Sequence, residues 1–565
     1  MTLRADCAQP ASETLKARPP AAASADGHDA SGPGARRRLS ANYARFACEV
    51  AHAEARLRAG RLEEAALSAS LAAAFATQKH CGVFASERLE RVLGEISRSL
   101  PDRCGEFRRV SKASDVRRVL HVATEVTAVG GLTRMLTRWI RTDASRQNSV
   151  VLTRNRGLFP EPLAAAITES GGRRFLLNTR PGSAFGWALR LRRLARLHDL
   201  VVLHIHCEDA LPVIAFGPAR SLPPVLMLNH ADHLFWLGSG ISHAVLNLRE
   251  AASDITINRR GVAPERSLML PTLIDPPSRQ MDRSQARTAL GIDQDSTVLL
   301  SVARGAKYRP MNGVTYASRF VSILRDNPRA RLFVVGSGAP ADWTAAQDQV
   351  PGQIIGLPEQ PDPRAYFEAA DIYVDSYPFS SSTSLMEAAG YGLPLLSLFT
   401  APDEARLVGI NHLGLIGGVL QARSEAEWED TLRRLIASPD LREAQSRTAL
   451  QAVAIAQPEQ WRGWLEHAYQ QALDLPPSDP LSGPMPQRPD EARYGEPDCR
   501  HEDMYGSHTP LTDIAKDQMG AFSALTRLRL LGGHLRRGEI GSPIEAARLL
   551  APEWLKRRLK GALGG

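Results

Sequence analysis

Four consecutive hydroxyl residues, Ser381 to Ser384, stand between a short apolar run and a segment with helical character. Hydroxyl side chains at the start of a helix cap its unpaired backbone N–H groups, and together these groups bind an anion the size of a phosphate. The candidate phosphate ligands are therefore Ser382, Thr383 and Ser384. Glu387 follows about one turn later, where a carboxylate suits the hydroxyls of a ribose. The structural alternative is an ordinary serine-rich N-cap followed by a surface glutamate.

Histidines follow two neighbouring apolar runs. His204 and His206 alternate near the end of the run 200–206, so we expect both to face the same side, toward a cleft. His230 and Asp232 follow the next run. A histidine there can accept the proton of a substrate hydroxyl or bind a phosphate, with Asp232 orienting it. The alternatives are a hydrogen-bonded structural histidine and a zinc site, but the spacing to His233 is poor for zinc and a fourth ligand is not identified, so we expect no metal.

A glycine pair, Gly130 and Gly131, lies between the first predicted strand and the first predicted helix. Glycines let the backbone approach a sugar or diphosphate where a Cβ would collide. The pair is part of neither a Gly-x-Gly-x-x-Gly nor a Gly-x4-Gly-Lys-Ser/Thr motif, which disfavours a dinucleotide dehydrogenase and a P-loop kinase.

Short apolar runs alternate with helical segments along residues 111–275 and again along 285–455. The runs of the first stretch are 116–123, 149–153, 174–178, 200–206, 224–230 and 254–258, and those of the second are 297–303, 331–336, 352–356, 371–376 and 393–399. We also expect a helix over 313–328. Such alternation predicts parallel sheets covered by helices. We therefore expect an α/β protein of two Rossmann-like, doubly wound domains facing a cleft, with ligands outside the carboxyl ends of the strands.

The remaining segments differ in composition. Residues 1–40 are rich in Ala, Ser, Pro, Gly and Arg and predict a disordered leader, whereas 41–110 predict helices that include one tetratricopeptide-like hairpin. A helix is expected over 456–475 and a Pro-rich linker over 476–515. Residues 516–565 predict a basic amphipathic helical tail. Such a helix binds anionic lipid, which suggests peripheral contact with a membrane, unless it docks on its own protein.

Charge and cysteine usage narrow the class of protein. The chain has 69 Lys and Arg against 61 Asp and Glu, so a formal charge of +8 on 565 residues does not favour nucleic acid as a partner. Six cysteines without a Cys-x-x-Cys pair indicate neither a zinc knuckle nor a disulfide scaffold, and they favour a reducing compartment. No signal peptide or apolar run of ~20 residues occurs. We therefore expect a cytoplasmic protein, with the tail as the one membrane-contacting segment.

The spacing around the hydroxyl cluster resembles the sugar-nucleotide motif of GT-B glycosyltransferases, in particular that of the O-linked N-acetylglucosamine transferase branch. The matching positions are Asp375, Pro378, Thr383, Glu387, Gly392 and Pro394, with Lys307 and Pro310 upstream. The resemblance covers roughly residues 295–420. It implies that Lys307 and Arg304 neutralise the donor diphosphate, that the hydroxyl cluster caps a phosphate and that Glu387 binds the ribose.

Two further positions bear on this resemblance. The run that contains His230 resembles the acceptor-side loop of these enzymes, and the glycine pair takes the place of their glycine loop beside the donor. Retaining members of family four carry a Glu-x7-Glu signature, but here Phe379 stands at the first acid position. The resemblance therefore favours inversion over retention.

These observations predict a glycosyltransferase of the hexosyltransferase class that uses a nucleoside-diphosphate sugar, with a UDP-sugar favoured. Cationic side chains and helix N–H groups would stabilise the departing diphosphate, so neither a metal nor a cofactor is required. The acceptor is open: a protein, a glycan, a lipid-linked saccharide or a small metabolite. Two alternatives remain, a non-catalytic sugar-nucleotide-binding or assembly subunit and a UDP-sugar epimerase on the same fold.

Overall fold

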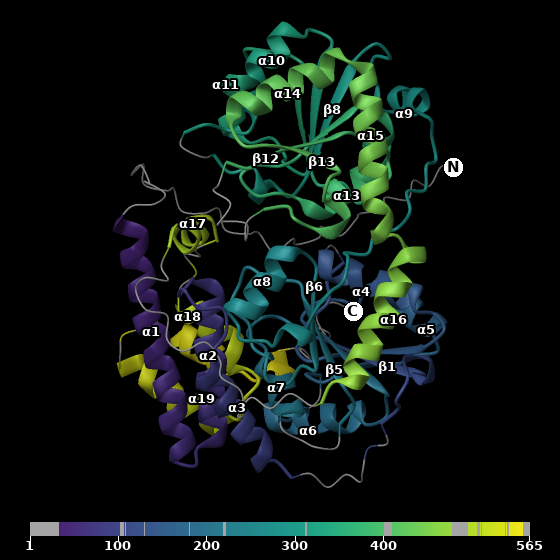
Figure 1. Ribbon diagram of the computed structural model, residues 1–565. Helices are drawn as coiled ribbons and strands as arrows, with labels where there is room; N and C mark the ends of the chain where they lie inside the picture. Colours follow the sequence, from purple (N-terminus) through teal and green to yellow (C-terminus); the bar gives the residue numbers. More distant parts are fainter. Residues whose placement is uncertain are drawn as a thin grey trace, which may run out of the picture.

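The structure is a computed structural model. It describes the chain except residues 1–32, 102–106, 108, 129, 180, 218–221, 311–312, 401–408, 477–494, 506–508, 510, 537, 539–541 and 557–565. The described residues form two parallel sheets, each covered by helices, and a group of helices from the N-terminal and C-terminal segments (Figure 1). Within this described part, no helix combines the length and the apolar character needed to cross a bilayer.

The N-terminal domain contains a seven-stranded parallel sheet with the order β3-β2-β1-β4-β5-β6-β7. Its strands are β1 (Arg118–Ala123), β2 (Gln147–Leu152), β3 (Arg174–Leu176), β4 (Leu200–His204), β5 (Val225–Asn229), β6 (Ala244–Asn247) and β7 (Ser267–Met269). Its helices are α4 (Gly131–Thr142), α5 (Glu161–Glu169), α6 (Ala184–Ala195), α7 (Ala210–Phe216) and α8 (Glu250–Asn258). Every residue of β4, β5 and β6 is buried, as expected of strands covered on both faces.

The C-terminal domain contains a six-stranded parallel sheet with the order β10-β9-β8-β11-β12-β13. Its strands are β8 (Thr297–Val302), β9 (Ala330–Val335), β10 (Ile354–Leu357), β11 (Ile372–Val374), β12 (Leu395–Leu398) and β13 (Val419–Ala422). Its helices are α9 (Arg283–Leu290), α10 (Val321–Asp326), α11 (Thr344–Gln347), α12 (Arg364–Ala369), α13 (Ser382–Gly390), α14 (Glu425–Ala437) and α15 (Pro439–Val453).

Both sheets place their first strand in the interior and change direction beside it, between β1 and β4 and between β8 and β11. This order is that of a doubly wound Rossmann-like domain, in which the crevice at the change of direction binds ligands. The predicted fold class, α/β with two Rossmann-like domains, is confirmed.

Two local predictions were wrong, and two short strands were not predicted. Residues 254–258, predicted as a strand, form the end of α8, because the parallel neighbours β6 and β7 need a crossover connection between them. Topology therefore overrides the strand preference of the β-branched residues there. The short strands β6 and β7 themselves were not predicted. The helix expected over 313–328 is reduced to a 3-10 turn, Ala317–Phe320, followed by α10.

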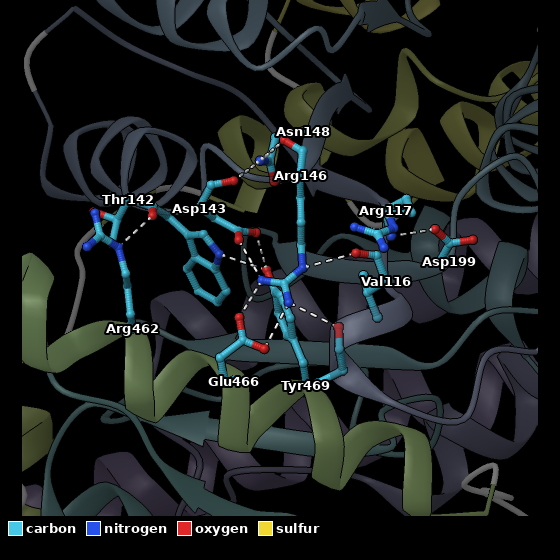
Figure 2. A network of polar contacts seen from close by, with 12 residues as sticks. Val116, Arg117, Thr142, Asp143, Arg146, Asn148, Asp199, Arg462, Glu466 and Tyr469 are labelled. Carbon is cyan, nitrogen blue, oxygen red and sulfur yellow. Dashed lines mark hydrogen bonds and ion pairs between the residues drawn. The ribbon is translucent and has the colours of Figure 1, made fainter.

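Helix α16 (Pro458–Asp474) follows the C-terminal domain in the chain but packs on the N-terminal domain (Figure 1). Figure 2 shows the polar network that holds it, centred on the buried Arg146. Nη1 of Arg146 lies 2.7 Å from carboxylate oxygens of both Asp143 and Glu466. Tyr469 donates a hydrogen bond of 3.0 Å to Asp143. Because α16 carries Glu466 and Tyr469, the network links the two domains at a second place besides the connecting chain.

The helical group combines helices from the N-terminal and the C-terminal parts of the chain. Its members are α1 (Pro33–Arg58), α2 (Leu62–Gln78), α3 (Glu87–Ser99), α17 (Glu496–Tyr505), α18 (Leu511–Met519), α19 (Ala524–Arg536) and α20 (Pro543–Leu550). Helix α1 begins inside the stretch 1–40 that we predicted to be disordered, and α17 and α18 begin inside the predicted linker 476–515. The rest of the leader that we predicted, residues 1–32, lies outside the described residues.

The helical group is attached to the N-terminal domain by a buried carboxylate. Glu90 of α3 accepts a hydrogen bond of 2.6 Å from the backbone N–H of Gly238. Burial raises the pKa of Glu90 to about 7, against the lowering effect of its backbone hydrogen bonds. The hairpin of α1 and α2 thus packs on a neighbouring domain, as an isolated repeat unit requires.

Candidate functional site

A cavity of about 550 Å³ lies between the two domains. The N-terminal domain lines it with residues that include Gly131, Arg138, His230, Asp232 and Arg249. The C-terminal domain contributes Lys307, Arg309, Phe379, Ser382, Thr383 and His412, among others. The cavity therefore brings together the glycine loop, the acceptor-side loop and the hydroxyl cluster that were singled out in the sequence.

Lys307 ends a 3-10 turn, Gly305–Lys307, directly after β8. Its Nζ donates a hydrogen bond of 2.7 Å to the backbone carbonyl of Ser380, immediately before the hydroxyl cluster. Burial lowers the pKa of the Lys307 ammonium, and the charge of Arg304 acts in the same direction, while Asp375 opposes both. The lysine is thus a desolvated cation held against the loop that leads to α13.

Ser382 and Thr383 occupy the first turn of α13 and line the cavity. Ser384 does not line it, and its hydroxyl lies 3.0 Å from that of Ser381 instead. Of the three candidate phosphate ligands, two are therefore placed at the cavity and one supports the turn from behind.

The loop before α13 is shaped by Asp375. This buried carboxylate accepts hydrogen bonds of 2.9 Å from the backbone N–H groups of Ser376 and Ser381, and one of 3.0 Å from the hydroxyl of Ser397. Burial raises the pKa of Asp375, and these hydrogen bonds and Lys307 oppose the rise. Asp375 therefore positions the start of α13 rather than facing the cavity.

Arg309 was not singled out in the sequence. It lines the cavity, and its guanidinium lies 4.6 Å above the centre of the Phe379 ring. Arg304, which was predicted to bind the diphosphate, is exposed and does not contribute to the described lining of the cavity. Lys307 and Arg309 are thus two cations of the C-terminal domain in the described lining of the cavity, and the Phe379 ring supports Arg309.

Glu387 lies on α13 beside a second, smaller cavity of about 250 Å³. Its Oε1 accepts from Nη1 of Arg134 at 3.1 Å and from Nη2 of Arg138 at 3.3 Å. Both arginines are on α4, so these ion pairs cross from one domain to the other. Arg138 lines both cavities and stands at their junction.

His230 follows β5 and lines the larger cavity. Its Nε2 donates a hydrogen bond of 2.8 Å to the carbonyl of Ile205, which leaves Nδ1 as the acceptor of the neutral ring. Burial lowers the pKa of His230 to about 4. The ring is therefore neutral at physiological pH and has one nitrogen able to take a proton.

Asp232 does not orient His230 as we expected. Its carboxylate accepts hydrogen bonds from both Nε and Nη2 of Arg249, the latter at 2.6 Å. It also lies 3.3 Å from Nδ1 of His233. Burial acts to raise the pKa of Asp232, but Arg249 and His233 outweigh it and hold the pKa below its ordinary value. The His230 ring is fixed instead by its hydrogen bond to the backbone carbonyl of Ile205. The sequence did not reveal this contact.

The predicted role of His204 in the cleft was wrong. Its Nε2 lies 3.0 Å from Nδ1 of His121, and the ring packs against Trp139 of α4 in the core. Strand β4 ends at His204, so the alternation that was to carry both histidines into the cleft stops there. His206 lies beyond the strand, 3.9 Å from Glu125, and is absent from the described lining of the cavity.

Gly131 lines the cavity at the first residue of α4. At Gly130 a Cβ would come within 2.7 Å of the Thr127 hydroxyl, which explains a glycine there. Of the glycine pair, Gly131 therefore lies at the cavity, whereas Gly130 is absent from its described lining and is required by the contact with Thr127.

His412 is a cavity residue that the sequence did not suggest. It lies in the C-terminal domain and forms a β-bridge with Arg249, while Arg249 donates at 2.7 Å to the carbonyl of Gly409. Burial lowers the pKa of His412 to about 4. These contacts tie the acceptor-side loop to the C-terminal domain.

No three His, Cys, Asp or Glu side chains converge, anywhere in the described chain, in an arrangement that could hold a metal ion. The rings of His230 and His233, which were the alternative zinc ligands, bond to the Ile205 carbonyl and to Asp232 respectively.

The chain is similar to several solved structures at low sequence identity. No protein-family profile and no curated protein matches it. It is similar to the crystal structure of a glycosyltransferase from Rickettsia africae, with 12% identity, coverage of 64% of this chain and 99% of that chain, and a TM-score of 0.48. It is also similar to a mutant O-GlcNAc transferase from Thermobaculum terrenum, with 16% identity, coverage of 77% of this chain and 85% of that chain, and a TM-score of 0.44. A third similar structure is HepE from Anabaena in complex with UDP and glucose, with 14% identity, coverage of 62% of this chain and 98% of that chain, and a TM-score of 0.46.

The assignment of the architecture rests on the molecule itself. Two sheets of Rossmann-like order are covered by helices on both faces, and residues of both domains line one cavity. This is the GT-B architecture.

Proposed function

We propose that the protein is a glycosyltransferase that transfers a sugar from a nucleoside-diphosphate sugar, with a UDP-sugar favoured and without a metal. The observation that carries the proposal is the meeting of Lys307, from the loop after β8, with Thr383, from the start of α13, on one cavity. A buried cation beside a helix N-terminus is an arrangement suited to a pyrophosphate.

The two cavities suggest how the donor would lie. The smaller one has Glu387 on one wall and the loop after β10 on another, which suits the ribose and base of a nucleoside. The larger one offers room for the sugar and the acceptor. The diphosphate would then lie at their junction, with Lys307 and Thr383 on one side and Arg138 on the other.

These residues would stabilise the negative charge that develops on the diphosphate during the reaction. When the anomeric carbon–oxygen bond breaks, its electron pair passes to the diphosphate, and positioned donors stabilise that charge in the transition state. The oxygen of the acceptor hydroxyl forms the new bond to the anomeric carbon. Its proton would pass to Nδ1 of His230, the ring nitrogen that accepts. We propose inversion of configuration, since Phe379 stands where a retaining acid is expected.

One observation favours the second candidate, a non-catalytic sugar-nucleotide-binding subunit. The low pKa of His230, about 4, makes it a weak base, and Phe379 cannot replace the missing acid. The acceptor stays open between a protein, a glycan, a lipid-linked saccharide and a small metabolite. A cytoplasmic location is supported by the four described cysteines, Cys48, Cys81, Cys207 and Cys499, all of which are free thiols.

The test is turnover of a panel of UDP-sugars by the full chain, with and without Lys307→Ala. We expect hydrolysis or transfer of one donor, reduced about 10²–10³-fold in the variant, the scale of one preorganised donor. Binding of a donor without turnover would favour the non-catalytic subunit. Release of an epimerised sugar in the absence of acceptor would favour an epimerase instead.

A further inference from the structure

Helix α19 presents leucines to solvent. Leu525, Leu528 and Leu535 are 56%, 53% and 49% exposed, and their spacing puts them on one face of the helix. The side of the helix that faces the protein is also apolar, because Leu530 and Leu531 are only 5% and 6% exposed. A surface helix of a protein surrounded only by water carries polar residues on its outer face. The outer leucines therefore indicate a second apolar surface, which we name the α19 stripe (Leu525, Leu528 and Leu535).

Basic residues accompany the stripe. Arg536 lies along its edge, one turn after Gly532, whereas Arg529, one turn after Leu525, is held by an ion pair of 2.9 Å to Glu64 of α2. The neighbouring α20 exposes Ile544 at 68%, and Arg548 is exposed one turn further along. Residues 524–565 contain nine Lys or Arg against three Glu, so this segment holds six of the chain's eight net positive charges.

We propose that the α19 stripe and its arginines bind the surface of an anionic phospholipid bilayer. The leucines would enter the boundary between headgroups and acyl chains, while the guanidinium groups of Arg536 and Arg548 pair with lipid phosphates. A second copy of the chain fits less well. In a twofold symmetric interface the same patch meets itself, which would bring the exposed Arg536 and Arg548 close to their own equivalents.

The binding surface is fixed to the N-terminal domain. Ala184 at the start of α6 donates a backbone hydrogen bond of 2.7 Å to Ala521, just before α19. Arg154 reaches Gln518 at 3.0 Å, and Asn178 reaches Glu553 at 2.8 Å. The membrane contact would therefore hold the N-terminal domain in a set orientation, rather than through a loose tail. This inference does not depend on the proposed donor chemistry.

The experiment is co-sedimentation of the full chain with vesicles of phosphatidylcholine and phosphatidylglycerol, and with vesicles of phosphatidylcholine alone. We expect binding to the mixed vesicles that weakens with salt. The double substitution Leu528→Asn with Leu535→Asn should lower the partition coefficient about tenfold or more. Its control, Leu158→Asn with Leu197→Asn, changes two leucines of the N-terminal domain that are 93% and 58% exposed and should leave binding unchanged.

A charge variant keeps the test independent of the leucines. Arg536→Gln with Arg548→Gln should weaken binding to the mixed vesicles about 30-fold at low salt, since each arginine near an anionic surface contributes about fivefold. Arg434→Gln with Arg447→Gln, on α14 and α15, is the matched control. The proposal is overturned if the wild type does not bind mixed vesicles, or if the α19 variants bind as it does. It is also overturned if the leucine variant dissociates a dimer seen by sedimentation velocity while no vesicle binding occurs.

Discussion

Arg138 of α4 donates from Nη2 to Oε1 of Glu387 on α13 across 3.3 Å, and the two residues belong to different domains. Arg138 also bonds to Asp275, at 2.7 Å, in the segment that connects the domains. Its side chain is only 10% exposed and stands at the junction of the two cavities. A donor diphosphate at that junction would replace part of this ion-pair network with its own negative charge.

Arg138→Ala is expected to weaken donor binding. The substitution removes a largely desolvated cation from the junction, and we expect kcat/KM for the donor to fall about 10- to 100-fold. Arg134→Ala is the control, because Arg134 bonds to the same carboxylate but is 51% exposed, and its loss should change kcat/KM less than about threefold. Initial rates against donor concentration measure both. Equal effects of the two variants would contradict a special role for Arg138.

Glu387→Ala tests the ribose assignment. Charge-assisted hydrogen bonds from the ribose hydroxyls to this carboxylate would be lost, so UDP should bind about tenfold more weakly. An analogue of UDP without the 2′ and 3′ hydroxyls should bind wild type and variant alike. Calorimetric titration of both ligands gives the comparison. If the variant weakens the analogue as much as UDP, Glu387 acts through its arginine partners and not through the ribose.

Asp375→Ala is expected to destabilise the C-terminal domain. It leaves two buried backbone N–H groups and the Ser397 hydroxyl without their acceptor, at a cost of about 3 kcal/mol. Asp375→Asn keeps one acceptor oxygen, so its free energy of unfolding should fall by less. Urea unfolding of the three proteins provides the measurement, and an unchanged free energy of unfolding in Asp375→Ala would show that the carboxylate does not hold the loop.

Glu90→Gln is expected to change how stability depends on pH. The pKa of Glu90 is raised from 4.5 to about 7 in the folded protein, so folding binds a proton, and the wild type loses stability as pH rises from 4.5 through 7. The neutral amide does not titrate. The free energy of unfolding of Glu90→Gln, relative to wild type, should therefore rise by up to about 3 kcal/mol between pH 4.5 and pH 8.

Urea unfolding across that range checks the Glu90 prediction. Glu87→Gln, on the same helix but paired with Arg91 at the surface, is the control and should show no such trend. A difference between Glu90→Gln and wild type that stays constant with pH would contradict the assignment of the raised pKa to Glu90.

The sheets were predictable because their central strands are continuous apolar runs, as in β4 and β5, which local composition reveals. The strands β6 and β7 are short, and α8 between them is rich in β-branched residues, so only the topology identifies them. The sequence alone could not locate the end of β4, on which the fate of His204 and His206 depends.

The site was predictable where one segment supplies it, as with Thr383 and Glu387 on α13. It was not predictable where residues distant in sequence meet. Arg309 and His412 reach the cavity from loops without a motif, and Arg138 reaches Glu387 from 249 positions earlier in the chain. The one signal present was the spacing of Arg134 and Arg138, four residues apart on the helix after the glycine pair.

In the proposed function, Lys307 and the start of α13 together hold one nucleoside diphosphate in the cleft. Calorimetric titration of UDP into wild type, Lys307→Ala and Arg304→Ala tests it most directly. We expect saturable binding to wild type, an affinity about 10- to 100-fold lower in Lys307→Ala, and little change in Arg304→Ala, whose exposed side chain lies outside the described cavity lining. Absence of UDP binding to wild type, or equal affinity in Lys307→Ala, would contradict the claim.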